Sequence, residues 1–139
     1  MPERSRDWIK QAWRDLDSAR AQMEDGFFEW SCFIAQQAAE KAIKAIYQKM
    51  GAEAWGHSVT DLLKVSKEKI NVPDELVDGA KQLDRFYIPA RYPNSWATGI
   101  PAEYIDRKDA LNAIDNSEKL LQFCASILAE QDSAERKTP

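Results

Sequence analysis

Arg91 is the residue of this chain best placed for recognition chemistry. It lies in an irregular stretch, residues 87–101, whose three prolines and one glycine exclude a long helix. A guanidinium binds phosphate through two parallel hydrogen bonds, and the neighbouring ring of Tyr92 offers a surface on which a base could stack. Two structural alternatives stay open. Arg91 could instead fix its own loop through carbonyl groups or Glu103, and the loop aromatics could serve only as anchors.

A second polar feature follows one face of the helix expected over residues 28–50. Gln37, Lys41 and Lys44 recur there at helical spacing, so they could form a floor for phosphate groups beside Arg91. The alternative is an ordinary solvated face, with Lys44 paired to Glu40 four residues earlier. The single histidine, His57, precedes a predicted helix start. We interpret it as a loop or capping residue, with acid–base chemistry as the less common alternative.

The elements that must position these side chains are all helical. Apolar residues recur every three to four positions, and no strand alternation stands out. We expect an all-α, up-and-down antiparallel bundle of about five helices, formed by one domain over residues 1–132 with a frayed tail over 133–139. The expected helices span residues 5–25, 28–50, 58–69, 73–86 and, starting between 106 and 109, to about 131.

The second of these helices is expected at the centre of the bundle. Five alanines on its apolar arc allow neighbouring helices to approach closely. Trp30 and Phe33 lie outside that arc, so the first half of the helix is apolar nearly all round. Either a second subunit or the flanking loops of the same chain would have to cover this additional face.

Composition excludes several classes of protein. The net charge is −4, from 19 basic and 23 acidic residues, so general attraction to DNA or RNA is not expected. Cys32 and Cys124 are far apart and lie in apolar stretches, which indicates buried free thiols and a cytoplasmic location. We expect no metal site, no cofactor and no membrane span, since metal-ligand motifs and long apolar runs do not occur.

Four segments, taken in order, resemble the HEPN domain of prokaryotes. They are a tryptophan-containing first helix, EWSCFIAQQAAEKAIKAIY at residues 29–47, GHSVTDLL at 56–63, and RYPNSW followed by GIPAEYI within 91–105. The resemblance implies a helical bundle that forms a homodimer. It also implies either a ribonuclease of toxin–antitoxin systems or a binding module that partners a minimal nucleotidyltransferase.

The ribonuclease motif of that family is missing from this sequence. It consists of an arginine followed, after four to six residues, by a histidine, and the corresponding positions after Arg91 hold Trp96, Ala97 and Thr98. We therefore assign no catalytic residue and favour a binding and dimerisation module over an enzyme. The favoured hypothesis is a nucleotide-binding partner of a nucleotidyltransferase, with its site at Gln37, Lys41, Lys44, Arg91 and Tyr92. A ribonuclease that uses Arg91 with Tyr92 or His57, and a scaffold without a ligand, remain the alternatives.

Overall fold

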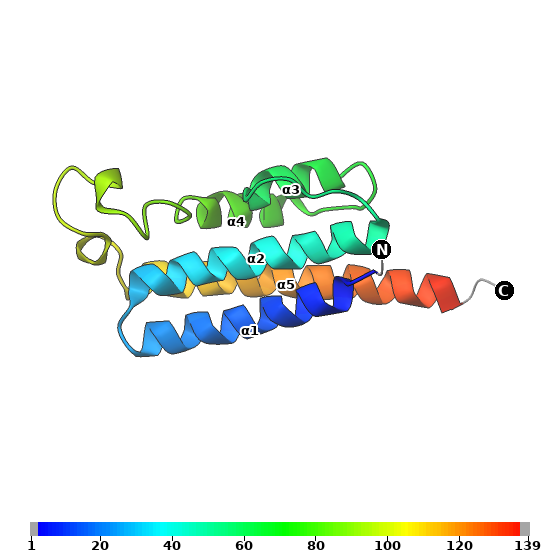
Figure 1. Ribbon diagram of the computed structural model, residues 1–139, viewed down its shortest axis with the longest axis horizontal. Helices are drawn as coiled ribbons and strands as arrows, with labels where there is room; N and C mark the ends of the chain where they lie inside the picture. Colours follow the sequence, from blue (N-terminus) through cyan, green and yellow to red (C-terminus); the bar gives the residue numbers. More distant parts are fainter. Residues whose placement is uncertain (1–2, 137–139) are drawn as a thin grey trace.

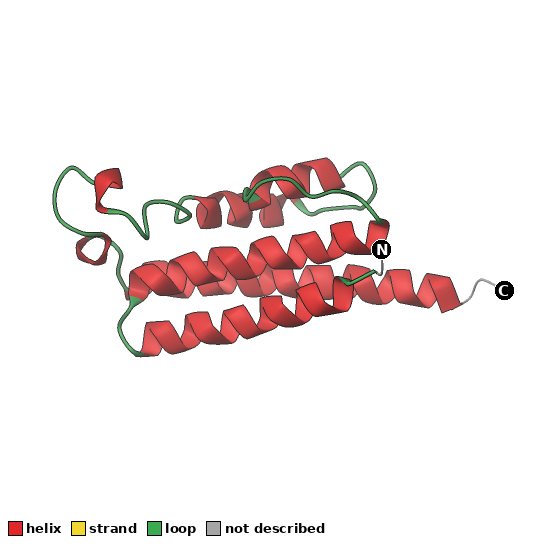
Figure 2. Cartoon of the chain, in the orientation of Figure 1, coloured by secondary structure: helices red, strands yellow, loops and turns green. Residues whose placement is uncertain are grey.

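The computed structural model describes residues 3–136, and within that range it contains only helices and loops (Figures 1 and 2). The expected all-α class is confirmed. None of the described helices is long and apolar enough to cross a membrane. The elements, in order, are the helices α1 (Ser5–Glu24), α2 (Phe28–Met50), α3 (Val59–Ser66) and α4 (Asp74–Asp84), the short 3₁₀ turns η1 (Pro93–Ser95) and η2 (Pro101–Glu103), and the long helix α5 (Arg107–Arg136).

Helix α2 lies at the centre of the bundle, between α1, α5 and the layer formed by α3 and α4 (Figure 1). The alanines at 35, 38, 39, 42 and 45 are fully buried, and their small side chains let the neighbouring helices come close. Two serines reinforce the contacts from inside. Ser31 Oγ donates to the Ala19 carbonyl of α1 at 2.7 Å, and Ser117 Oγ of α5 donates to the Ala35 carbonyl at 2.7 Å.

The chain direction alternates along the bundle. Helix α1 runs antiparallel to α2, the chain returns along α4, and α5 then runs in the same direction as α2 (Figure 1). Contacts at both ends of the α2–α5 pair agree with this direction. Ala35 meets Ser117 in the first half of both helices, and Lys49 meets Asp132 near their ends.

Three helix ends differ by two residues or more from the positions expected from the sequence: those of α3, of α4, which ends at Asp84 and not at residue 86, and of α5. Helix α3 stops at Ser66 rather than near residue 69, because the next turns are tightened. Lys67, Glu68 and Lys69 each donate their backbone N–H to the carbonyl three residues earlier. The C-terminus of α2 lies where it was expected, at Gly51, whose φ of 67° is readily adopted only by glycine.

Helix α5 continues five residues beyond the expected end, because an ion-pair cluster holds its last turns. Lys49 Nζ lies 2.8 Å from Asp132 and 2.9 Å from Glu135. The hydrogen bonds that Lys49 donates to these carboxylates raise the pKa of Lys49, and the bond that Asp132 accepts lowers the pKa of Asp132. Residues 133–136, expected to fray, are therefore helical, while 137–139 lie outside the described residues. A domain boundary at residue 132 stays a prediction.

The carboxylate of Asp84, at the end of α4, joins three elements of the bundle. It accepts hydrogen bonds from Gln36 of α2, at 3.1 Å, and from Ser58 in the loop before α3, at 3.2 Å. It also accepts from the first two backbone N–H groups of α3, at 3.1 and 2.9 Å, and from the Thr60 hydroxyl, at 2.6 Å. These N–H groups have no partner within the helix, so a carboxylate from another helix completes the cap that Ser58 begins.

We predict that Asp84→Ala lowers the free energy of unfolding by about 2–3 kcal/mol, because it leaves several part-buried donors without their acceptor. Asp78→Ala provides the matched control, since Asp78 lies on the exposed face of the same helix. Urea denaturation followed by circular dichroism measures both variants. Equal midpoints for the two would contradict the role given to Asp84.

Candidate functional site

The proline-rich segment of residues 87–101 is held in shape by hydrogen bonds within it and by its contacts with Tyr104. Trp96 donates its indole N–H to the Pro89 carbonyl at 2.9 Å, and its ring stacks on Tyr104 with centroids 4.3 Å apart and planes 7° apart. The Tyr104 hydroxyl donates to the Thr98 carbonyl at 2.5 Å. Trp96 is thus one of the anchoring aromatics that we considered. Tyr92, by contrast, remains 47% exposed.

Arg91 lies against three aromatic rings. Its guanidinium carbon is 4.4 Å from the ring centre of Phe33, 4.7 Å from that of Tyr87 and 5.1 Å from that of Tyr92. Its Nε donates to the Tyr87 carbonyl at 2.7 Å, and this bond fixes the orientation of the guanidinium group. Part of the loop-fixing role that we considered for Arg91 is therefore present.

No carboxylate within residues 3–136 forms an ion pair with Arg91. Glu103, which we considered as its partner, instead accepts from the backbone N–H of Ile100 at 3.1 Å. The terminal nitrogens of Arg91 consequently remain available, beside an exposed tyrosine, for an anion from outside the chain.

The two lysines of the predicted phosphate floor already form ion pairs with carboxylates of the same chain. Lys41 Nζ lies 2.5 Å from Asp15 of α1, and Lys44 Nζ lies 3.3 Å from Glu40. Gln37 donates its amide to Gln36 at 2.7 Å. Along α2, Lys41 and Lys44 lie about 12 and 16 Å beyond Phe33, the point of contact with Arg91. The structure therefore brings Arg91 and Tyr92 together and leaves the lysines farther along the helix.

His57 joins this site, although we favoured a loop role for it. Its Nδ1 lies 3.1 Å from Glu40, whose side chain is buried, and its ring stacks on Tyr87 at 5.1 Å with an 18° interplanar angle. In the tautomer in which Nδ1 carries the proton, Nδ1 donates to Glu40 and Nε2 is the nitrogen left for other chemistry. The His57 side chain is 57% exposed.

Arg91 and His57 thus contact the same tyrosine ring, and we call these two residues with Tyr87, Phe33 and Glu40 the Arg91–His57 cluster. Sequence spacing could not identify it, since the cluster combines α2, the α2–α3 loop and the segment after α4. The one signal in the sequence was the position of His57 directly before Ser58, the cap of α3, which fixes His57 at the start of that helix.

Cysteine chemistry has no place in this cluster. Burial raises the pKa of the Cys32 thiol to about 12, and burial also raises the pKa of Cys124. Both thiols are unpaired, fully buried and protonated at neutral pH. Within residues 3–136, histidine, cysteine and carboxylate side chains do not gather in a group of three or more that could hold a metal ion.

Large apolar side chains remain exposed at the same end of the molecule as the cluster. Trp30 at the start of α2 is 43% exposed, and its ring forms a T-shaped pair with that of Phe33, with centroids 6.1 Å apart. Arg91 and Tyr87 cover Phe33, so the loops cover part of the additional apolar face of α2. We call the remaining exposed apolar residues the apolar end: Phe27, Trp30, Ile88, Tyr92, Ile100 and Tyr104.

Comparison with known families decides what kind of domain carries this cluster. The model of the HEPN domain matches residues 5–128, nearly the whole bundle. The chain belongs to the HEPN family. The resemblance found from the sequence is thereby confirmed.

Several solved structures share its fold. The crystal structure of TT1696 from Thermus thermophilus superposes with a TM-score of 0.87, at 42% identity, over 90% of this chain and 98% of that one. ST0689, described as an archaeal HEPN homologue, gives a TM-score of 0.76 at 39% identity over 90% and 98% of the two chains. A HEPN domain protein of Thermotoga maritima, tm0613, gives 0.74 at 36% identity over 88% and 98%.

A curated relative extends the comparison to function. The protein named "Putative toxin MJ1304" of Methanocaldococcus jannaschii is 23% identical over 133 residues, which are 89% of this chain and 88% of that protein. This HEPN chain is therefore related to a protein described as a toxin.

Proposed function

We propose that this HEPN protein is a binding and dimerisation module that holds the phosphate of a nucleotide at Arg91, with Tyr92 as a stacking surface for the base. The observation that carries the proposal is the guanidinium of Arg91, which pairs with no carboxylate of the described residues, is oriented by the Tyr87 carbonyl and is bordered by aromatic rings. Gln37, Lys41 and Lys44, which the sequence suggested as a floor for phosphate groups, lie farther along α2 than Phe33, the residue that Arg91 contacts. The ion pairs of the two lysines make their contribution secondary to that of Arg91.

Titration calorimetry with ATP and GTP tests the phosphate site. We expect saturable binding that weakens about 10- to 100-fold in Arg91→Ala, because a charge-assisted hydrogen-bond pair to phosphate is lost. Arg85→Ala is the matched control: it removes an exposed arginine just after α4 that belongs to no ion pair of the described residues. Equal affinity of wild type and Arg91→Ala would contradict the proposal. Wild-type protein without saturable binding at millimolar ligand would favour the scaffold without a ligand.

The module is proposed to act as a homodimer and as the partner of a minimal nucleotidyltransferase in a toxin–antitoxin-like pair in the cytoplasm. The apolar end supports self-association, because several large apolar side chains are exposed at one end of the molecule and exposed apolar patches often mark protein interfaces. The nucleotidyltransferase is carried over from the family resemblance, and the related toxin supports the paired system. The two unpaired, buried cysteines support a reducing compartment.

Light scattering coupled to size-exclusion chromatography measures both assembly proposals. We expect the protein alone to elute with the mass of a dimer, and the same protein co-expressed with a neighbouring nucleotidyltransferase to elute as a larger complex of both chains. A strictly monomeric species would contradict the first proposal. Separate elution of the co-expressed proteins would count against the second.

A metal-independent ribonuclease is the second candidate, and the position of His57 favours it. In such a reaction His57 Nε2 would take the proton of a ribose 2′-hydroxyl while the 2′-oxygen bonds to phosphorus and the bond to the 5′-oxygen breaks. Arg91 would stabilise the charge on the phosphoryl oxygens, and the proton would pass from His57 to the leaving 5′-oxygen. Glu40 would hold the imidazole in the required tautomer.

Incubation of the purified protein with a single-stranded RNA tests this candidate. We expect cleavage to 2′,3′-cyclic phosphate ends without added metal, with a loss of at least about 100-fold in His57→Gln and in Arg91→Ala. Lys69→Ala is a control that changes a lysine of the exposed turn after α3. Intact RNA with the wild-type protein, or cleavage that survives His57→Gln, would leave binding as the function.

A further inference from the structure

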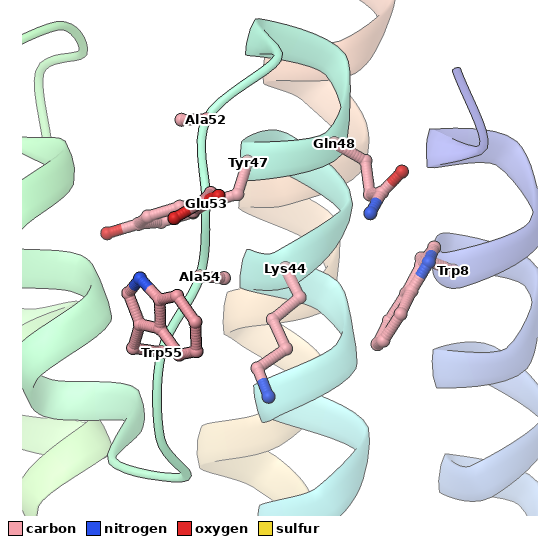
Figure 3. A pocket seen from close by; sticks show the side chains of 8 residues that line it. All are labelled: Trp8, Lys44, Tyr47, Gln48, Ala52, Glu53, Ala54 and Trp55. Atoms are coloured by element: carbon pink, nitrogen blue, oxygen red, sulfur yellow. The ribbon is translucent and has the colours of Figure 1, made fainter. Parts of the chain in front are cut away.

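The side of α1 that faces α2 is already occupied. Trp8 of α1 and Trp55 of the loop after α2 border a hollow of about 320 Å³, which we call the tryptophan-lined hollow (Figure 3). Lys44, which also lines it, is one of the residues that the sequence suggested as a phosphate floor. This hollow therefore belongs with the site described above, and the outer side of α1 is the side without an assigned contact.

The outer side of α1 separates its unpaired charges by sign. Helix α1 packs on α2 and α5 and lies on the opposite side of the bundle from α3 and α4 (Figure 1). The exposed cations of its first half are Arg6, Lys10 and Arg14, and the exposed carboxylates that follow are those of Asp17, Glu24 and Asp25.

The three cations repel one another along the helix. They are spaced by four residues, which places neighbouring side chains about 6 Å apart along one side of α1. None of them forms an ion pair with a carboxylate of residues 3–136, whereas Arg4 and Arg20 of the same helix do. Like charges at this spacing destabilise an isolated helix, so carboxylates from outside the chain would stabilise α1.

The carboxylates of the second half are also unfavourable for an isolated helix. Glu24 and Asp25 lie at the C-terminus of α1, where the helix dipole favours cations, and the last turn of α1 contains no basic residue. Both are exposed and form no ion pair within the described residues. Asp17 has a single long contact, 3.5 Å from Arg20, and its side chain is 68% exposed. Cations from outside the chain would therefore stabilise this half.

Two shallow hollows open on this same side of α1. Each has a volume of about 470 Å³, and Arg14 and Asp17 line both. All of their lining residues belong to α1, so they are grooves between the side chains of one helix. Grooves of this kind receive the side-chain ridge of a second helix.

We propose that the outer side of α1 pairs with α1 of a second copy of the chain, antiparallel to it, about a two-fold axis between Arg14 and Asp17. An antiparallel copy brings the basic half of each helix to the acidic half of the other. Arg14 then lies opposite Asp17 of the second copy, and symmetry repeats this pair. A nucleic acid, by contrast, would be repelled by the acidic half of the same surface.

The same register satisfies the charges farther from the axis. Lys10 lies opposite the small side chain of Ala21, which leaves it room beside Glu24 of the second copy, and Arg6 lies opposite Asp25. This surface shares no residue with the apolar end. The proposal therefore goes beyond the dimer proposed above and does not depend on it.

Sedimentation velocity over a range of protein concentrations tests the contact. Exposed ion pairs contribute little each, so we expect the wild-type mass to double only at high protein concentration and low salt, and to fall back at about 0.5 M salt. Arg14→Asp turns two attractions into two repulsions, and we expect it to weaken this association at least about tenfold. Arg14→Asp/Asp17→Arg exchanges the two charges and should restore it. Lys81→Asp, the same charge change at an exposed lysine of α4, is the matched control.

The outcomes separate this contact from the dimer at the apolar end. Doubling of the mass that is lost in Arg14→Asp and restored in the exchanged variant would support the α1 contact, whether the smaller species is a monomer or a dimer. A wild-type mass independent of concentration, association unchanged in Arg14→Asp, or no recovery in the exchanged variant would overturn it. Because Arg14 is exposed, both variants are expected to keep the wild-type melting temperature.

Discussion

The carboxylate of Asp84 is the point on which the arrangement of the Arg91–His57 cluster depends. It holds the start of α3 through two backbone N–H groups and holds α2 through Gln36. Gln36 in turn donates to the carbonyl of His57 at 2.9 Å, so the histidine loop is fixed by the same network. Tyr87 follows Asp84 by three residues, which places the ring that contacts both Arg91 and His57 directly after the carboxylate. One acidic side chain thereby sets both halves of the cluster.

Helix α2 distributes the polar chemistry along its length. Its first turns contact Arg91 through Phe33, its middle contributes the buried Glu40 to His57, and its last turns form the wall of the tryptophan-lined hollow. The Glu40 carboxylate reaches Lys44 with one oxygen and His57 with the other, and so connects the middle of the helix to both neighbouring regions. A central helix packed through alanines can do this, because its small side chains fill the core and leave the remaining face for polar groups.

Membership of the HEPN family explains the bundle, but it does not by itself assign the chemistry of this chain. The spacing of arginine and histidine that marks the ribonuclease branch is missing after Arg91. The structure nevertheless places an arginine and a carboxylate-bound histidine against one tyrosine ring, with the histidine coming from an earlier loop. Members of the family with a different spacing of arginine and histidine can therefore be compared by the side chains found at the position of the Arg91–His57 cluster, and not by the sequence motif alone.

The sequence by itself determined the class of fold, the positions of most helix ends, the central place of α2 and the resemblance to the family. The helices and their ends depend on periodicity, capping and the placement of glycine and proline, which are all set by residues close together in the sequence. It also identified Arg91 as the candidate anion-binding residue, because an arginine inside an irregular segment is visible without a structure.

Only the tertiary structure decided that Lys41 is paired with Asp15 of another helix, that His57 and Arg91 contact the same Tyr87 ring, and that Trp8 and Trp55 border one hollow. Each of these contacts joins side chains far apart in the chain, and their meeting depends on how the helices rotate and pack against each other, which periodicity alone does not specify.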